Sequence, residues 1–81
     1  MKYKVEIAEL ADHFVVAFKE KDTLRVKKVM KLNRLGTDIL RAYMEEVPQE
    51  ELIPILANRY QSTIENMQIE VSKFYADLAQ Y

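Results

Sequence analysis

The sequence predicts an α+β fold in which a three-stranded antiparallel sheet is followed by three helices. Apolar residues recur at every second position through the first 32 residues, as in half-buried strands, and at helical spacing after residue 33. The 81 residues suffice for one small domain, expected to span residues 1–81, and a single Gly and two Pro leave few irregular loops. Three strands and then three helices predict a winged helix-turn-helix-like arrangement with the helices on one face of the sheet.

The predicted strands form an antiparallel meander. The first covers residues 3–8, the second residues 13–18 and the third residues 23–32, and the polar segment 19–22 is expected to be the hairpin between the last two. The side chains expected to share the core face of each strand are Tyr3, Val5 and Ile7, then Phe14, Val16 and Phe18, then Leu24, Val26, Met30 and Leu32.

The first two helices follow from a cap and from two prolines. Asn33 is a strong N-cap, and a first apolar stripe of Leu35, Ile39 and Tyr43 runs on before Pro48 closes the region. A second helix is expected to begin near Pro48, because proline fits a first turn. Pro54 would cost about 3 kcal/mol in a helix interior, so this helix is expected to start later or to bend. Its apolar residues are Leu52, Ile55, Leu56 and Tyr60.

The third helix is predicted from a capping box. Ser62 is followed three residues later by Glu65, the spacing at which the two side chains cap each other's backbone N–H groups. Its expected apolar stripe consists of Ile64, Met67, Val71, Phe74, Leu78 and Tyr81.

Composition excludes several function classes. The chain has no Cys and only one His, His13, so disulfides, thiolate metal sites and multi-histidine metal sites are ruled out, and no cofactor is expected. The paired acids of residues 45–46 and 50–51 are ordinary solvated charges near helix ends, and the lone Gly36 cannot form a phosphate loop. We therefore expect no enzyme activity. No apolar run of about 18 residues spans a membrane, and no signal peptide is recognisable, so a cytoplasmic location is expected.

Charge is divided unevenly along the chain. Residues 1–41 hold ten basic and six acidic residues, a net +4, whereas residues 42–81 hold two basic and seven acidic residues, a net −5. Five basic residues and no acidic one lie between Thr23 and Arg34. Such a block is typical of an interaction surface, and the alternative is a solvated strand face whose lysines prevent edge-to-edge aggregation.

The junction between the third strand and the first helix resembles a known family. It reads Leu32-Asn33-Arg34-Leu35-Gly36-Thr37-Asp38-Ile39-Leu40. A strand ending in Leu-Asn, followed by a glycine and an aliphatic pair that enters a helix, is similar to the PqqD family, named for pyrroloquinoline quinone biosynthesis. The resemblance covers residues 23–81 and continues through Glu50-Glu51-Leu52, Leu56, Tyr60, Val71, Phe74 and Leu78.

The resemblance implies a RiPP recognition element, a domain that acts as a peptide chaperone in natural product biosynthesis. Such a domain binds the leader segment of a ribosomally synthesised precursor peptide and delivers the precursor to a modifying enzyme. The partners it implies are the precursor peptide and a radical SAM protein or a leader peptidase. In the family the leader adds a strand beside the third strand and packs against the third helix.

Elementary sheet geometry agrees, because the third strand of a meander is an edge with unpaired backbone groups. The expected peptide-binding residues of the strand are Arg25, Val26, Lys27, Lys28, Val29, Met30 and Lys31. Those of the third helix are Met67, Gln68, Val71, Ser72 and Tyr75. For three of these a purely structural role is the alternative: Tyr75 would lie on the hydrophobic rim with its hydroxyl in water, and Met30 and Met67 would fill the core.

Two other functions are compatible with the same pattern. A winged helix-turn-helix could bind DNA through a basic hairpin and the third helix. That helix, however, carries Glu65, Glu70 and Asp77 against Lys73 alone, so no nucleic-acid partner is expected. The exposed edge could also pair with a second copy of the chain as a homodimer.

Overall fold

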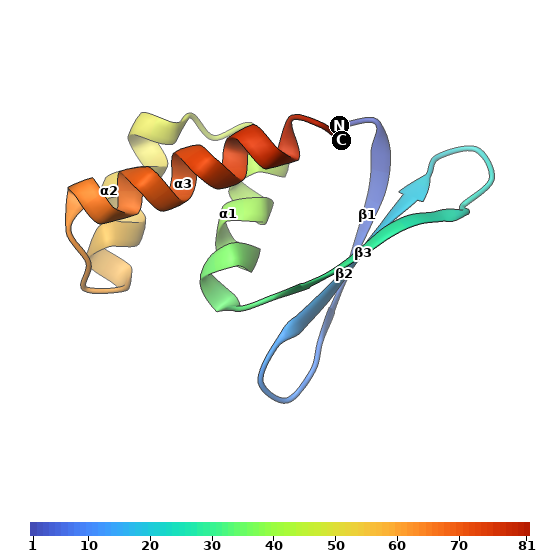
Figure 1. Cartoon of the computed structure of the whole chain (residues 1–81), viewed down its shortest axis with the longest axis horizontal. Coiled ribbons are helices and arrows are strands. Elements are labelled where there is room, and N and C mark those ends of the chain that lie inside the picture. The colour runs from blue at the N-terminus through green and yellow to red at the C-terminus, as the bar shows by residue number, and fades with distance from the viewer. The chain divides into compact units, whose positions relative to one another are not determined.

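Three antiparallel strands are followed by three helices, as the sequence predicts, and the fold is α+β (Figure 1). The computed structural model describes residues 1–81. The strands are β1 (Tyr3–Glu9), β2 (Phe14–Glu20) and β3 (Val26–Leu32), and the helices are α1 (Arg34–Met44), α2 (Gln49–Arg59) and α3 (Ile64–Leu78). Contacts divide the chain into two compact units: a sheet unit of residues 1–38 with Tyr81, and a helical unit of residues 39–80. The prediction of a single domain stays a prediction.

The sheet has the strand order β1-β2-β3, so β2 is central and the other two strands are its edges. On β2, Phe14, Val16 and Phe18 are buried while the residues between them are half-buried. We call the face that carries these three side chains the inner face and the opposite one the outer face. The predicted core faces of the first two strands are therefore confirmed, with Val5 opposite Phe18 and Ile7 opposite Val16.

The predicted face of the third strand is wrong at its first two residues. The register shifts beside Lys19, which pairs with Val26, whereas the neighbouring Phe18 pairs with Lys28. Lys27 is the extra residue of this β-bulge. Because opposed residues share a face, Val26 lies on the outer face and Lys28 on the inner face. Leu24 precedes β3 in an exposed hairpin of residues 21–25, which begins later than expected because β2 continues to Glu20.

Helix α1 begins at the predicted cap. The Asn33 side-chain oxygen accepts a hydrogen bond from the N–H of Gly36 (2.8 Å), and the hydroxyl of Thr37 donates to the carbonyl of Asn33 (2.9 Å). Thr37 is fully buried, and this bond satisfies its hydroxyl. The Leu-Asn-x-x-Gly element thus has a local structural role, which is to turn the end of β3 into a helix.

The second helix begins at the predicted proline, and the third begins one residue later than predicted. Pro48 is the N-cap of α2, and the helix continues through Pro54 to Arg59, so the later start offered as an alternative is wrong. Thr63, not Ser62, is the N-cap of α3, and its side chain accepts from the N–H of Asn66 (3.0 Å). The capping box is wrong by one residue, because the Ser62 N–H donates to the carbonyl of Ala57 and so belongs to the end of α2.

Three apolar residues depart from their expected stripes: Ile55, Ile64, which is 49% exposed at the start of α3, and Tyr81. On α2 the buried residues are Leu52, Ile53, Leu56 and Ala57, and Ile55 is 51% exposed. The buried positions follow the 3.6-residue period, which turns Ile55 to the opposite side of the helix. Helix α3 ends at Leu78, so Tyr81 is no part of its stripe and belongs to the sheet unit.

Both connections between helices use a residue with a positive φ angle that is not glycine. Glu46 (φ 60°) ends α1 and Gln61 (φ 52°) ends α2. In each case the next residue donates its N–H five residues back, Val47 to Ala42 (3.0 Å) and Ser62 to Ala57 (2.8 Å). This is the Schellman motif, in which glycine is the preferred residue at the left-handed position.

Replacing Gln61 with glycine is therefore expected to raise the free energy of unfolding by about 0.5–1 kcal/mol, because a left-handed conformation costs a residue with a Cβ more than it costs glycine. Urea unfolding followed by circular dichroism measures the change. Gln61→Ala is the matched control and should give no gain, since alanine keeps the Cβ. Equal gains from both variants would contradict the assigned φ angle.

Candidate functional site

Strand β3 is an open edge of the sheet. Val26, Lys27, Lys28 and Val29 are all exposed, so both faces of its first half are open. Alternate residues of an edge strand direct their N–H and C=O groups away from the neighbouring strand, and no backbone group outside the sheet pairs with residues 26–32. This edge can accept a further strand.

The opposite edge is less open. Lys2, immediately before β1, donates its backbone N–H to the carbonyl of Tyr81 (2.9 Å). Three side chains of β1, those of Tyr3, Val5 and Ile7, are half-buried, whereas none in the first half of β3 is. Of the two edges, β3 is therefore the one that more readily accepts an extended peptide.

The edge strand and its flank carry a surplus of positive charge. Arg25, Lys27, Lys28 and Lys31 form no ion pair within 4 Å. The ammonium of Lys28 lies 5.6 Å from the ring centre of Tyr81 on the inner face. On the outer face, by contrast, Lys19 is paired with Glu6 (2.7 Å), and this hydrogen bond and charge lower the pKa of the Glu6 carboxyl. The open edge and its flank thus carry four cations that form no ion pair.

The flank of α3 that the sequence assigns to peptide binding is largely engaged within the helical unit. Met67 and Val71 are buried in the core, so their side chains are not accessible to a peptide. The hydroxyl of Ser72 donates to the Gln49 side chain (3.0 Å). Of the five predicted residues of α3, Gln68 is the exposed one without such a contact.

Tyr75 is tied to the connection between α1 and α2. Its hydroxyl donates to the backbone carbonyl of Val47 (2.7 Å), and its ring meets that of Tyr43 edge to face at 5.0 Å. Burial, and secondarily the neighbouring Tyr43, raise the pKa of Tyr75 above its ordinary value of 10.0. The structural alternative is therefore wrong about the hydroxyl, which donates its hydrogen bond to a backbone carbonyl and not to water.

Tyr81 lies on the sheet, a position that its sequence pattern does not predict. Its ring stacks on Phe18 at 4.7 Å and meets Tyr3 edge to face at 6.2 Å. An aromatic residue three positions after Leu78 fits the spacing of one more helical turn. No signal in the sequence distinguishes such a turn from a chain that has left the helix. The tyrosine instead covers part of the inner face of the sheet beside β3.

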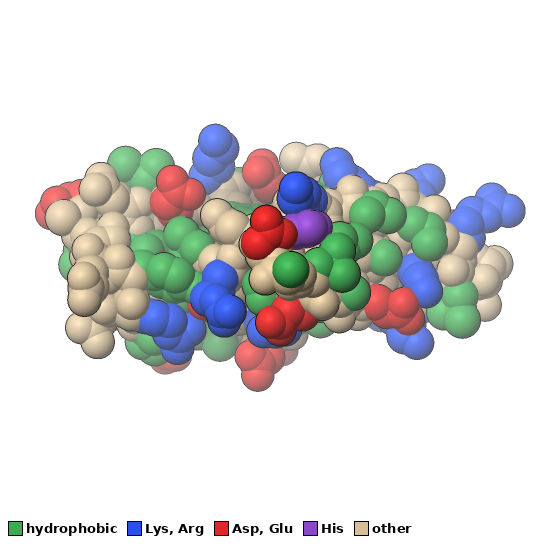
Figure 2. All heavy atoms as spheres, turned by 90° about the horizontal axis from the view of Figure 1, so that it is seen from below, with side chains coloured by type: hydrophobic (Ala, Val, Ile, Leu, Met, Phe, Trp, Pro, Cys, Tyr) green, Lys and Arg blue, Asp and Glu red, His purple; other side chains and the backbone are tan.

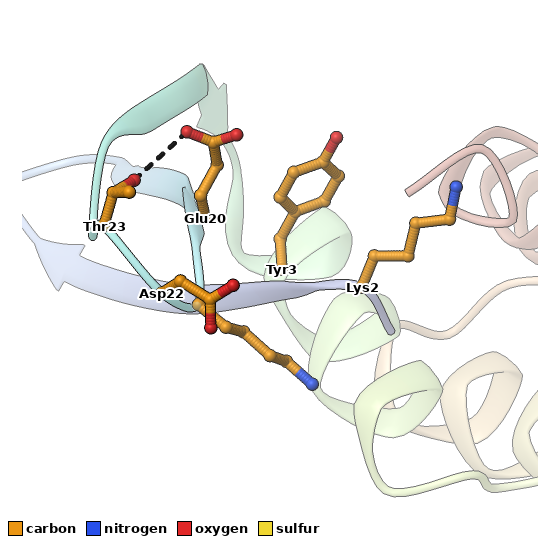
Figure 3. Close-up of a pocket in the computed structure, with 6 residues that line it drawn as sticks. Lys2, Tyr3, Glu20, Asp22 and Thr23 are labelled. Carbon is orange, nitrogen blue, oxygen red and sulfur yellow. Dashed lines mark hydrogen bonds between the residues drawn. The ribbon is translucent and has the colours of Figure 1, made fainter.

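One open pocket of about 400 Å³ lies at the hairpin end of the sheet (Figure 3). Its charged groups are of both signs. The hydroxyl of Thr23 is engaged, because it donates to the Glu20 carboxylate (3.2 Å) and accepts from the Arg25 N–H (3.2 Å). The lining residues are Lys2, Tyr3, Glu20, Lys21, Asp22 and Thr23.

Other features of the chain point to no further site. Figure 2 shows one face of the molecule, on which basic, acidic and apolar side chains are interspersed. No three His, Asp or Glu side chains come together as a metal site would require. None of the helices combines the length and apolar character needed to cross a membrane. Comparison with protein-family models, with curated proteins and with solved structures found no match to this chain.

Proposed function

We propose that the protein is a peptide-binding domain that takes up an extended segment as an additional strand along β3. Following the resemblance to the PqqD family, we propose as ligand the leader segment of a ribosomally synthesised precursor peptide. The protein would present it to a modifying enzyme and would have no enzyme activity of its own. The observation that carries the proposal is the open edge of β3. On the side away from β2 this edge has no backbone hydrogen-bond partner, and exposed residues lie on both of its faces.

Two features of β3 suit it to this role. Main-chain pairing along an edge supplies affinity for any extended segment, and side chains on the two faces supply selectivity. The unpaired cations at Arg25, Lys27 and Lys31 favour a segment that contains Asp or Glu, because complementary charge speeds association and determines register. Each exposed pair is worth about 0.2–1 kcal/mol, so main-chain pairing and apolar contacts must contribute most of the affinity.

The proposal predicts a defined pattern of NMR shifts. A blocked ten-residue peptide of alternating Val and Glu, titrated into the labelled protein, should shift the backbone amides of residues 25–31. The amides of residues 3–7, on the opposite edge, should remain largely unmoved. Shifts confined to the first strand would contradict addition at β3.

Charge reversal sharpens the same experiment. Lys27→Glu with Lys31→Glu should weaken binding of this peptide by about three- to tenfold, through a slower association rate, and should flatten the salt dependence. Lys2→Glu with Lys21→Glu is the matched control, because both lysines are exposed and lie outside β3. Equal losses from the two pairs would mean that only total charge matters. Binding abolished by several hundred mM salt would instead indicate capture of polyanions, including nucleic acid.

A further inference from the structure

The outer face of the sheet carries an apolar surface that continues onto the open edge. Its side chains follow from the strand register: Ala8 lies opposite Val15, and Ala17 lies opposite Val29. The ion pair between Lys19 and Glu6 lies on this same face and confirms the register. At β3 the surface ends in two valines that no strand covers, Val26 (49% exposed) and Val29 (58% exposed).

The β-bulge creates this apolar end. With regular alternation, the outer face of β3 would present Lys27, Val29 and Lys31, and the valine would stand between two charges. The bulge at Lys27 turns Val26 to the outer face instead, so that this face of β3 presents Val26 and Val29 side by side, with Lys31 beyond them opposite Val15. Val26 and Val29 therefore border the position that an added strand would occupy, while Lys28 and Met30 border it on the inner face.

Charge selects the occupant of this edge. A second copy of the chain would bring Arg25, Lys27, Lys28 and Lys31 of one β3 against the same four residues of the other, at the interstrand spacing of about 4.8 Å. Like charges across a sheet are destabilising. An acidic peptide is attracted to the same residues, so the complementary partner is an acidic peptide and not a second copy.

We infer that the added peptide strand turns its apolar side chains to the outer face, against Val26 and Val29, and its acidic side chains to the inner face, beside Lys28. This inference rests on the proposed strand addition. An apolar side chain in the outer position covers the two exposed valines, whereas an acidic one there would bury them against a charge. On the inner face an acidic side chain meets the ammonium of Lys28, which forms no ion pair and lies 5.6 Å from the ring centre of Tyr81.

Disulfide crosslinking tests the orientation directly, because the chain contains no cysteine. Val29→Cys and Met30→Cys place thiols on opposite faces of β3. Two blocked peptides of alternating Val and Glu each carry one central Cys, either in place of a Val or in place of a Glu. A disulfide forms readily only between residues on the same face, since it needs adjacent Cβ atoms.

In a glutathione buffer we expect Val29→Cys to form more disulfide with the peptide whose Cys replaces Val. Met30→Cys should prefer the peptide whose Cys replaces Glu. Mass spectrometry of the four combinations gives the ratios. The reverse preference, or none, would overturn the inference while leaving strand addition in place. No shift of the β3 amides and no crosslink in any combination would overturn strand addition itself.

A second variant needs no crosslink. Val29→Ser should weaken binding of the Val and Glu peptide by about fivefold, the factor expected when half of a valine side chain is no longer removed from water. Ile69→Ser, at a residue of α3 that is 65% exposed, is the matched control and should leave the affinity unchanged. An unchanged affinity in Val29→Ser would contradict an apolar contact on the outer face.

Discussion

Phe18→Ala is expected to lower the free energy of unfolding by about 3–5 kcal/mol, the range found for truncating a buried phenylalanine. Phe18 lies on the central strand and has no exposed surface. Its ring stacks on Tyr81 with centroids 4.7 Å apart and an interplanar angle of 21°. Truncation therefore removes the buried surface of the phenylalanine, leaves a cavity on the inner face and removes the ring on which Tyr81 stacks. Urea unfolding monitored by circular dichroism gives the change.

Two variants test the parts of this explanation. Val15→Ala changes the outer face of the same strand, where the side chain is only half-buried, and should cost about 1 kcal/mol or less. Tyr81→Ala removes the stacked ring alone. It should lower the free energy of unfolding by about 0.5–1.5 kcal/mol for the aromatic contact, in addition to the contribution of the apolar surface that the ring buries. If Val15→Ala proved as damaging as Phe18→Ala, the assignment of inner and outer faces would be wrong.

Tyr75→Ala is expected to destabilise the protein by about 3 kcal/mol, since it removes an aromatic contact, a hydrogen bond and buried ring surface together. The hydroxyl of Tyr75 donates to Val47 and its ring packs against Tyr43, so the side chain holds α3 to the connection that follows α1. Tyr75→Phe keeps the ring and removes only the hydrogen bond, so it should lower the free energy of unfolding by about 0.5–1.5 kcal/mol. Thermal and urea unfolding of the two variants distinguish the contribution of the ring to stability from that of the hydroxyl.

The burial of Tyr75 also predicts a dependence of stability on pH. Because the pKa of Tyr75 is raised in the folded protein, its neutral hydroxyl contributes stability in full below the ordinary value of 10.0. That contribution is lost as the pH rises through the raised pKa. The stability difference between the unsubstituted protein and Tyr75→Phe should therefore stay constant up to about pH 10 and shrink as the pH rises from there through the raised pKa. A difference that stayed constant above pH 10 would contradict the raised pKa of Tyr75.

Local patterns determined much of this fold. Alternation placed the inner face of the first two strands, because a half-buried sheet imposes a period of two on apolar residues. Asn33 marked the start of α1, because an N-cap satisfies free N–H groups within its own turn. The basic block and the edge position of β3 were also readable, since both depend only on composition and on the order of the strands.

Other features depend on partners that are distant in the sequence, and local patterns do not predict them. The bulge at Lys27 arises from the pairing of two strands, and no glycine in the sequence marks its position. It nevertheless moves Val26 to the outer face. Tyr81 leaves the helical pattern because Phe18 and the Lys2 N–H, more than 60 residues away in the sequence, hold its ring and carbonyl. Tyr75 is held against the connection between α1 and α2 because its hydroxyl donates to the carbonyl of Val47, 28 residues earlier in the chain. Periodicity describes which face a residue takes within its own element, but a hydrogen bond or a stacked ring needs a second group whose position the chain establishes only on folding.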